Sequence, residues 1–143
     1  MSGPSDRAHV VHQWVARADE DLAVADYLLA APGPRPHANI CYHAQQGVEK
    51  YVKALLVWRS VPFPRTHDTG ELVALLPADV PLPATAVEQE TLTDHATHTR
   101  HPGDWEPIEP DDAVTAVDLA RRVRDALRVH FPDPPPQSAL PSG

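Results

Sequence analysis

Four polar side chains recur at helical spacing between residues 43 and 53 of the chain. They are His43, Gln46, Lys50 and Lys53, which advance by three, four and three residues and so share one face of a helix. Ammonium, imidazole and amide groups gathered on one face suit the binding of a phosphate group or of an acidic partner. These four residues are therefore candidate ligand-binding residues.

The local charge around this face differs from that of the whole chain. Residues 37–61 carry three cations and one acid, a charge of +2, whereas the whole chain has a formal charge of −8. An alternative stays open, because Glu49 and Lys53 stand four residues apart and would pair on an ordinary solvated helix face.

A second group of polar residues lies near residue 100. His95, His98 and His101 are spaced by three, but steps of three drift around a helix and no acidic ligand completes a known metal motif. We therefore expect no metal site and no cofactor. Arg100 and His101 are catalytic candidates instead, because His can act as general acid or base on a phosphodiester while Arg stabilises the developing charge.

The prolines show which segments can position these residues. Proline interrupts helices, and the chain has 17 of them in clusters. Within the third proline-free segment, Asp68 precedes Glu71 by three residues, which predicts a capped helix of about two turns. We expect one helix in each of five segments, namely 5–31, 37–61, 65–76, 84–101 and 111–131.

Apolar residues recur every three or four positions in the first, second and fifth of these segments, which is typical of amphipathic helices. No segment alternates apolar and polar residues as a strand does, so the fold class is all-α, an up-and-down bundle of four or five helices. We expect the second helix to be the most buried. The stripes are Val11, Trp14, Ala18, Leu22, Ala25 and Leu29, then Ile40, Ala44, Val48, Tyr51 and Leu55, then Ala116, Ala120, Val123, Leu127 and Phe131.

Length and composition limit the class of protein further. The 143 residues are enough for one domain, predicted over residues 1–131, followed by a disordered proline-rich tail over 132–143. The excess of acidic over basic residues argues against the binding of duplex nucleic acid through a large basic surface. Cys41, the single cysteine, excludes an internal disulfide. Without a leader or an apolar run near ~20 residues, we expect a cytoplasmic protein that does not enter a membrane.

One long stretch of the chain resembles a known family. The run ICYHAQQGVEKYVKALL over residues 40–56 is similar to the helix that marks HEPN domain proteins. The resemblance extends from about Trp14 to Phe131. It includes Asp21-Leu22 and Leu28-Leu29 upstream, and Thr66-His67-Asp68, Leu75-Leu76 and Arg100-His101-Pro102 downstream, the last in the place of that family's R-Y-P.

This resemblance implies a helical bundle that forms a homodimer and binds nucleotide or RNA. It also implies a minimal nucleotidyltransferase as a partner in a toxin–antitoxin-like pair. Many members of the family are metal-independent ribonucleases that use Arg and His separated by four to six residues. Arg124 and His130 satisfy that spacing on the last predicted helix, as do Arg7 and His12 ahead of the matched region.

Three functions therefore stay open. The first is a HEPN protein that binds nucleotide, RNA or a nucleotidyltransferase through the face of His43, Gln46, Lys50 and Lys53. The second is a metal-independent endoribonuclease toxin acting through Arg124 and His130 or through Arg100 and His101. The third is a non-catalytic helical dimer whose polar faces serve solubility.

Overall fold

The structure is a computed structural model, and it describes residues 3–96 and 108–133. These residues form helices and connecting loops, and no strand occurs among them. The expected all-α bundle is thereby confirmed. The helices are α1 (Pro4–Ala30), α2 (His37–Trp58), α3 (Thr69–Val73), α4 (Ala86–Ala96) and α5 (Pro110–Arg128).

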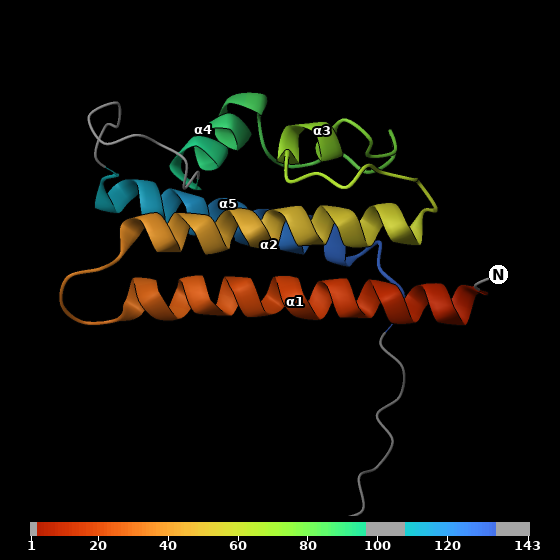
Figure 1. Cartoon of the computed structure of the whole chain (residues 1–143), viewed down its shortest axis with the longest axis horizontal. Coiled ribbons are helices and arrows are strands. Elements are labelled where there is room, and N and C mark those ends of the chain that lie inside the picture. Colours follow the sequence, from red (N-terminus) through yellow and green to blue (C-terminus); the bar gives the residue numbers. More distant parts are fainter. Residues whose placement is uncertain (1–2, 97–107, 134–143) are drawn as a thin grey trace, which may run out of the picture.

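Helix α2 lies at the centre of the bundle and packs against each of the other four helices (Figure 1). Helices α1 and α2 run antiparallel, and α5 runs alongside α2 in the same direction (Figure 1). The short helices α3 and α4 cover α2 on the side away from α1 (Figure 1). Helix α1 consequently forms one edge of the bundle, with its outer side turned away from the other helices.

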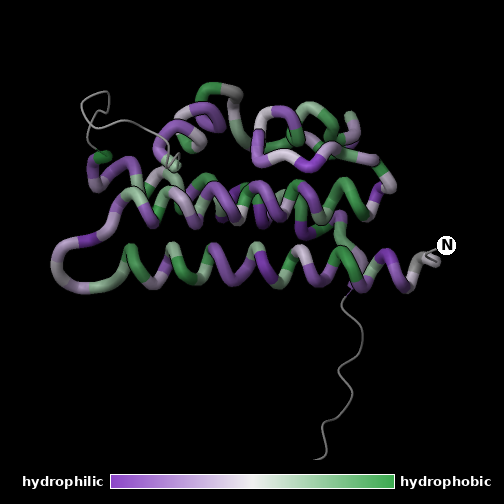
Figure 2. Tube along the Cα trace, viewed as in Figure 1, coloured by the Kyte–Doolittle hydropathy of each residue, from purple (hydrophilic) through white to green (hydrophobic). Residues whose placement is uncertain are grey.

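The core follows the apolar stripes expected from the sequence. All five stripe residues of α2 are at most 1% exposed, which confirms this helix as the most buried. Trp14 and Leu29 of α1 and Phe131 after α5 are only partly buried. Figure 2 shows the apolar residues interleaved with polar ones along each long helix, as amphipathic packing requires.

Helix ends differ from the predicted segments in ways that bear on the candidate residues. Helix α2 stops at Trp58, and Ser60 then adopts a left-handed backbone with φ of 57°. Helix α3 is only five residues long, although Asp68 does cap it by accepting a hydrogen bond from the amide of Glu71 at 3.1 Å. Helix α5 ends at Arg128, so His130 lies beyond the helix that was expected to contain it.

Candidate functional site

The candidate ligand-binding residues lie along the line where α1 meets α2. One carboxylate of α1 holds two of them, because Nδ1 of His43 donates to Oδ1 of Asp21 at 2.9 Å and the ammonium of Lys50 donates to Oδ2. All three side chains remain partly exposed. We call Trp14 and Asp21 of α1, together with His43, Gln46, Lys50 and Lys53 of α2, the polar seam.

Lys53 departs from the expected solvated face. Its side chain is only 9% exposed, and its ammonium lies 3.5 Å from a carboxylate oxygen of Glu49 and 5.4 Å from the ring centroid of Trp14. The i,i+4 pair with Glu49 does form, but inside the bundle. His67, from the loop before α3, approaches the same carboxylate at 3.2 Å, so Glu49 has cationic or donor groups on two sides.

Gln46 connects the polar seam to the start of α3. Its amide nitrogen donates to the side-chain oxygen of Gln45 at 2.9 Å. The amide nitrogen of Gln45 in turn donates to the hydroxyl of Thr69 at 2.7 Å, within the buried interior. These satisfied amides fix the orientation of Gln46 beside His43 and Lys50.

The spacing of the two helices explains why one carboxylate reaches both partners. His43 and Lys50 are seven residues apart, which places them two turns apart on one side of α2. Gly47 lies between them, and a Cβ at that position would stand 3.6 Å from the carbonyl oxygen of Ala18 and 4.0 Å from the Cβ of Asp21. Helix α1 therefore passes close to α2 just where Asp21 projects between the two cations.

The contacts with Asp21 leave some polar groups of the seam unused. An ionised carboxylate only accepts, so Nδ1 of His43 carries the proton and Nε2 is the nitrogen left for a ligand. With Nδ1 protonated, Nε2 of His43 accepts in the neutral ring and donates only in the imidazolium form. Lys50 has three ammonium protons, of which the contact with Asp21 uses one. The polar seam can thus present an imidazole nitrogen, ammonium protons and the Gln46 amide to a bound group.

Arg124 and His130, the predicted catalytic pair, lie in different surroundings. Nε of Arg124 donates to Asp125 at 2.9 Å, near Tyr51, whose hydroxyl donates to Asp19. Burial and this hydrogen bond raise the pKa of Tyr51. Within the described residues no hydrogen bond joins Arg124 to His130.

His130 instead belongs to a cluster at the end of the bundle. There Arg59 donates twice to Asp79, at 2.9 and 3.2 Å. The hydrogen bond from Arg59 holds the pKa of Asp79 below its usual range, and the nearby His130 adds a smaller lowering. His130 therefore lies within electrostatic reach of Asp79, and among the described residues no hydrogen bond joins it to Arg124 of the same chain.

The other histidine and arginine candidates give no site within the described residues. Arg100 and His101 lie outside those residues, as does His98, and His95 is on α4. The described part of the chain contains no group of three or more His, Cys, Asp or Glu side chains placed to hold a metal ion. Arg7 donates to Ser60 at 3.0 Å, whereas His12 contacts the carbonyl of Pro132 at 3.1 Å, so this pair is also engaged separately.

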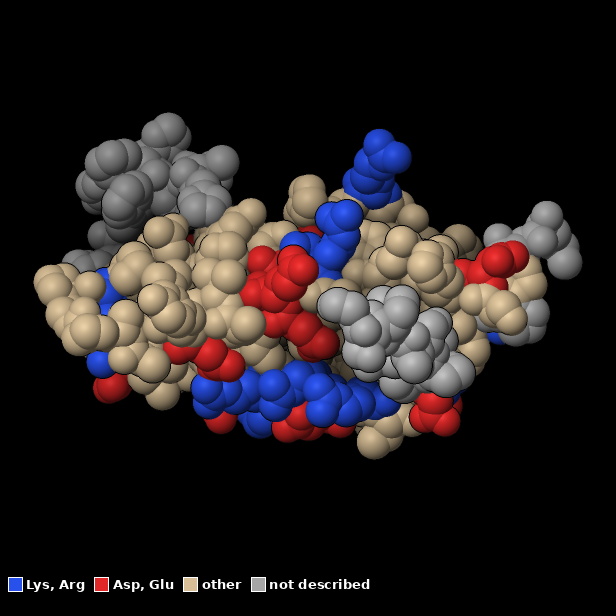
Figure 3. All heavy atoms as spheres, turned by 90° about the horizontal axis from the view of Figure 1, so that it is seen from below, with Lys and Arg blue, Asp and Glu red and all other residues tan. Residues whose placement is uncertain are grey.

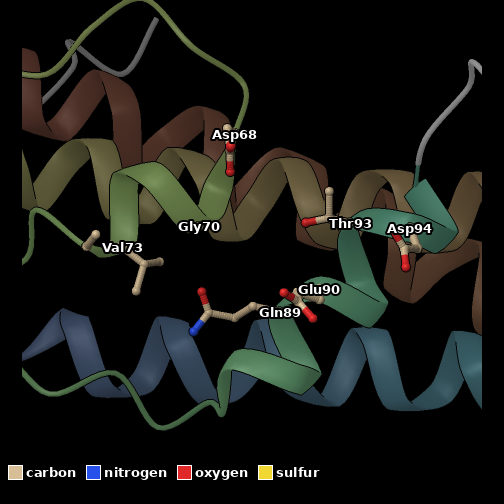
Figure 4. A pocket seen from close by; sticks show the side chains of 8 residues that line it. Asp68, Gly70, Val73, Gln89, Glu90, Thr93 and Asp94 are labelled. Atoms are coloured by element: carbon tan, nitrogen blue, oxygen red, sulfur yellow. The ribbon is translucent and has the colours of Figure 1, made fainter.

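A cavity of about 520 Å³ lies between α3 and α4 (Figure 4). Its lining includes the carboxylates of Asp68, Glu90 and Asp94. Figure 4 shows Val73 and Gln89 facing one another across the space. Negative charge on three sides disfavours a phosphate group there, so this cavity does not compete with the polar seam as an anion site.

Basic residues also gather on α5. Arg121, Arg124 and Arg128 are spaced by three and four and share one side of the helix. Figure 3 shows a band of Lys and Arg along one edge of the molecule with acidic side chains beside it. Two of the three arginines on this side of α5 pair with acids, Arg121 with Asp26 and Arg124 with Asp125, which offsets much of their charge.

Sequence reasoning missed the acids that organise both sites. Asp21 lies at the edge of the first apolar stripe, seven residues after Trp14. The spacing of residues gave no other indication that Asp21 belongs to the site. Asp79 and Arg59 lie in loops or at a helix end, where no periodicity marks them. Their pairing became visible only when the fold brought residues 20 positions apart together.

Within the described residues, no helix is long and apolar enough to cross a membrane. Comparison with curated proteins finds no significant match. Two solved structures share the fold. ST0689, an archaeal HEPN homologue, is 21% identical with a TM-score of 0.61, covering 85% of this chain and 98% of its own. TT1696 from Thermus thermophilus is 26% identical with a TM-score of 0.65, covering 83% of this chain and 96% of its own.

The family comparison agrees with the resemblance seen in the sequence. The model of the HEPN domain matches residues 11–130, which include the whole of α2 and every residue of the polar seam. The matched region ends at His130, close to the last described residue. On this match over most of its length, the chain belongs to the HEPN domain family.

Proposed function

We propose that this HEPN domain protein binds a phosphate-bearing ligand, a nucleotide or a segment of RNA, at the polar seam. The observation that carries the proposal is the contact of Asp21 with both His43 and Lys50. One carboxylate orients an imidazole and an ammonium side by side, so a bound phosphate meets the Lys50 ammonium and, when the ring is protonated, Nε2 of His43 in positions that are already fixed.

Helix α2 carries two lysines against one glutamate, although Asp21 and Glu49 each pair with one lysine of the polar seam. Both lysines of the chain belong to the polar seam, and α2 contributes only one acid, Glu49, which is buried. The ligand therefore approaches the least acidic helix of an acidic protein. Charge-assisted hydrogen bonds of this kind are stronger than neutral ones and depend on salt.

The test measures the affinity of the protein for AMP and for a ten-nucleotide single-stranded RNA. Binding is detected as a change in tryptophan fluorescence. Lys50→Gln should raise the dissociation constant about tenfold or more, since losing one charge-assisted contact costs roughly 1.4 kcal/mol or more. Arg128→Gln, at an exposed arginine of α5, is the matched control and should leave the affinity unchanged. Equal affinity in wild type, Lys50→Gln and His43→Gln would exclude the polar seam as the site.

A protein partner fits the same surface. The family resemblance implies a nucleotidyltransferase encoded beside the HEPN protein in a toxin–antitoxin-like pair. An acidic patch on such a partner would meet His43 and Lys50 as a phosphate does. Co-expression with a neighbouring nucleotidyltransferase should then yield a complex that Lys50→Gln weakens and Arg128→Gln does not.

A metal-independent ribonuclease is the second candidate function. One observation supports Arg124 in that role, since only its Nε is used by Asp125 and its terminal nitrogens make no hydrogen bond with described residues. His130 would have to come from a second copy, as a homodimer would allow. Cleavage of RNA in EDTA that disappears in both Arg124→Ala and His130→Ala would establish this activity, and cleavage retained in either variant would remove the pair.

A further inference from the structure

A depression on α1 continues the polar seam beyond the contacts of His43 and Lys50. It has a volume of about 250 Å³ and is lined by Val10, Gln13, Trp14 and Arg17. Trp14 also belongs to the polar seam, so the depression and the seam share a side chain. A ligand bound to the seam therefore lies next to the depression.

Trp14 gives the depression an aromatic surface. The indole is only partly buried, and the ammonium of Lys53 lies 5.4 Å from the ring centroid. Val10, beside Trp14 in the lining, is 39% exposed. Flat heteroaromatic rings stack on aromatic side chains through their faces and bury apolar surface in doing so. An indole next to an exposed valine thus suits a nucleobase.

Arg17 gives the same depression a cation. It is exposed, and within the part of the chain that the structure describes its side chain forms no ion pair or hydrogen bond. Arg17 precedes Asp21 by four residues, the spacing of a helical ion pair, but the carboxylate of Asp21 contacts His43 and Lys50 instead. The guanidinium of Arg17 is therefore left for a ligand, and a guanidinium stacks well on an aromatic ring.

Gln13 completes the lining with an amide. Its side chain is exposed, and among the described residues it forms no hydrogen bond. An amide both donates and accepts, as the edge of a nucleobase does. A second phosphate would use the guanidinium of Arg17 but would gain nothing from Trp14 and Val10. The four lining side chains together match a base better than another anion.

The distance between the depression and the phosphate contacts fits one nucleotide. Trp14 and Asp21 are seven residues apart on α1, roughly 10 Å along the helix axis. On α2, Lys53 at the Trp14 ring and Lys50 at Asp21 are three residues, about one turn, apart. The ribose of a nucleoside monophosphate can bridge this gap, with the phosphate at Lys50 and the base at Trp14.

We propose that the depression is a base subsite, in which one unpaired nucleobase stacks on Trp14 beside Arg17 while its phosphate contacts Lys50. This inference rests on the proposed function and narrows the ligand to a nucleoside phosphate or to an unpaired nucleotide of RNA. A base inside a duplex is stacked on its neighbours and has no free face for Trp14. Single-stranded RNA should consequently bind more tightly than the same sequence in a duplex.

The test compares AMP with ribose 5-phosphate, which lacks the base, by isothermal titration calorimetry. Wild type should bind AMP about tenfold more tightly, or more, because one stacked base contributes on that scale. Trp14→Leu should remove most of this difference by weakening AMP binding, and it should leave the affinity for ribose 5-phosphate unchanged. Glu20→Gln, at an exposed residue of α1 that does not line the depression, is the matched control.

Arg17→Gln provides a second variant, because Trp14 also contacts Lys53 and its replacement can disturb the fold. Arg17 is exposed, so this variant should unfold at the same urea concentration as wild type. It should raise the dissociation constant of AMP about threefold, as the loss of one cation stacked on the base predicts. The dissociation constant of ribose 5-phosphate should change less.

The outcomes separate the base subsite from the phosphate site. Equal affinity of wild type for AMP and ribose 5-phosphate, with both weakened by Lys50→Gln, would overturn the base subsite and leave the proposed function intact. A preference for AMP that persists in both Trp14→Leu and Arg17→Gln would place the base elsewhere and also overturn the inference. AMP binding that Trp14→Leu weakens and Lys50→Gln does not would contradict the phosphate site instead. No binding of either probe at millimolar concentration would overturn both.

Discussion

Glu49 and Lys53 form an ion pair that the bundle closes off from water. Their charged groups are 3.5 Å apart, and the side chains are 2% and 9% exposed. The ring of Trp14 lies over the ammonium and His67 approaches the carboxylate, so both charges have further neighbours. Such a pair is costly to break from one side, because the partner is left as an uncompensated buried charge.

Glu49→Ala should therefore lower the free energy of unfolding by about 3 kcal/mol, measured by urea denaturation. Replacing both partners together, as Glu49→Leu with Lys53→Met, should restore the free energy of unfolding to within about 1 kcal/mol of wild type. If Glu49→Ala and the double variant were equally unstable, the loss would come from packing and not from the unpaired lysine.

Gly47 should tolerate a side chain despite its place between two packed helices. A Cβ there meets Ala18 and Leu22 at 3.6 and 3.9 Å, which is ordinary van der Waals contact. Glycine inside a helix costs roughly 1 kcal/mol relative to alanine. Gly47→Ala should thus raise the free energy of unfolding by about 0.5–1 kcal/mol. A decrease would show that α1 and α2 pack more closely than these distances indicate.

Cys41 should be chemically inert in the folded protein. Burial, and secondarily the charge of Asp112, raise the pKa of its thiol to about 11, and the side chain is fully buried. At pH 8 a thiol reagent should modify the native protein at least about a hundredfold more slowly than the urea-unfolded chain, because thiolate and access are both lacking. Comparable rates in the two states would show that the start of α2 opens readily.

Tyr51 should make the protein sensitive to alkali. Burial, followed by the hydrogen bond to Asp19, raises the pKa of its hydroxyl above the ordinary value of 10.0. The folded state therefore keeps the proton while the unfolded chain loses it, so the stabilising contribution is complete below pH 10 and declines above it. Between pH 10 and 11, wild type should lose about 1 kcal/mol more unfolding free energy than Tyr51→Phe. Parallel pH profiles for the two proteins would contradict this.

The fold was largely predictable because the apolar residues that form its core recur at helical spacing. The apolar stripes of α2 and α5 mark their buried sides one residue at a time, and proline clusters mark the breaks. Helix ends were less predictable. Ser60 adopts a left-handed backbone, a conformation that usually calls for glycine. Helix α5 ends at Arg128, although the next proline is Pro132.

The site was predictable only in part. The spacing of His43 and Lys50 placed them on one side of α2, but their shared partner comes from another helix. Spacing also suggested that Lys53 was solvated, whereas Trp14 closes over it. Pairings between distant segments, such as Arg59 with Asp79, depend on how helices pack, and no local pattern encodes that.

Whether a phosphate-bearing ligand engages His43 and Lys50 decides the proposed role of the polar seam. The most direct measurement is an NMR titration of ¹⁵N-labelled protein with AMP, following the ring nitrogens of the histidines. We predict that Nε2 of His43 shifts in a saturable way, that His9 and His95 do not, and that the shift disappears in Lys50→Gln. An unchanged His43 signal under conditions where AMP binds elsewhere would contradict the proposed site.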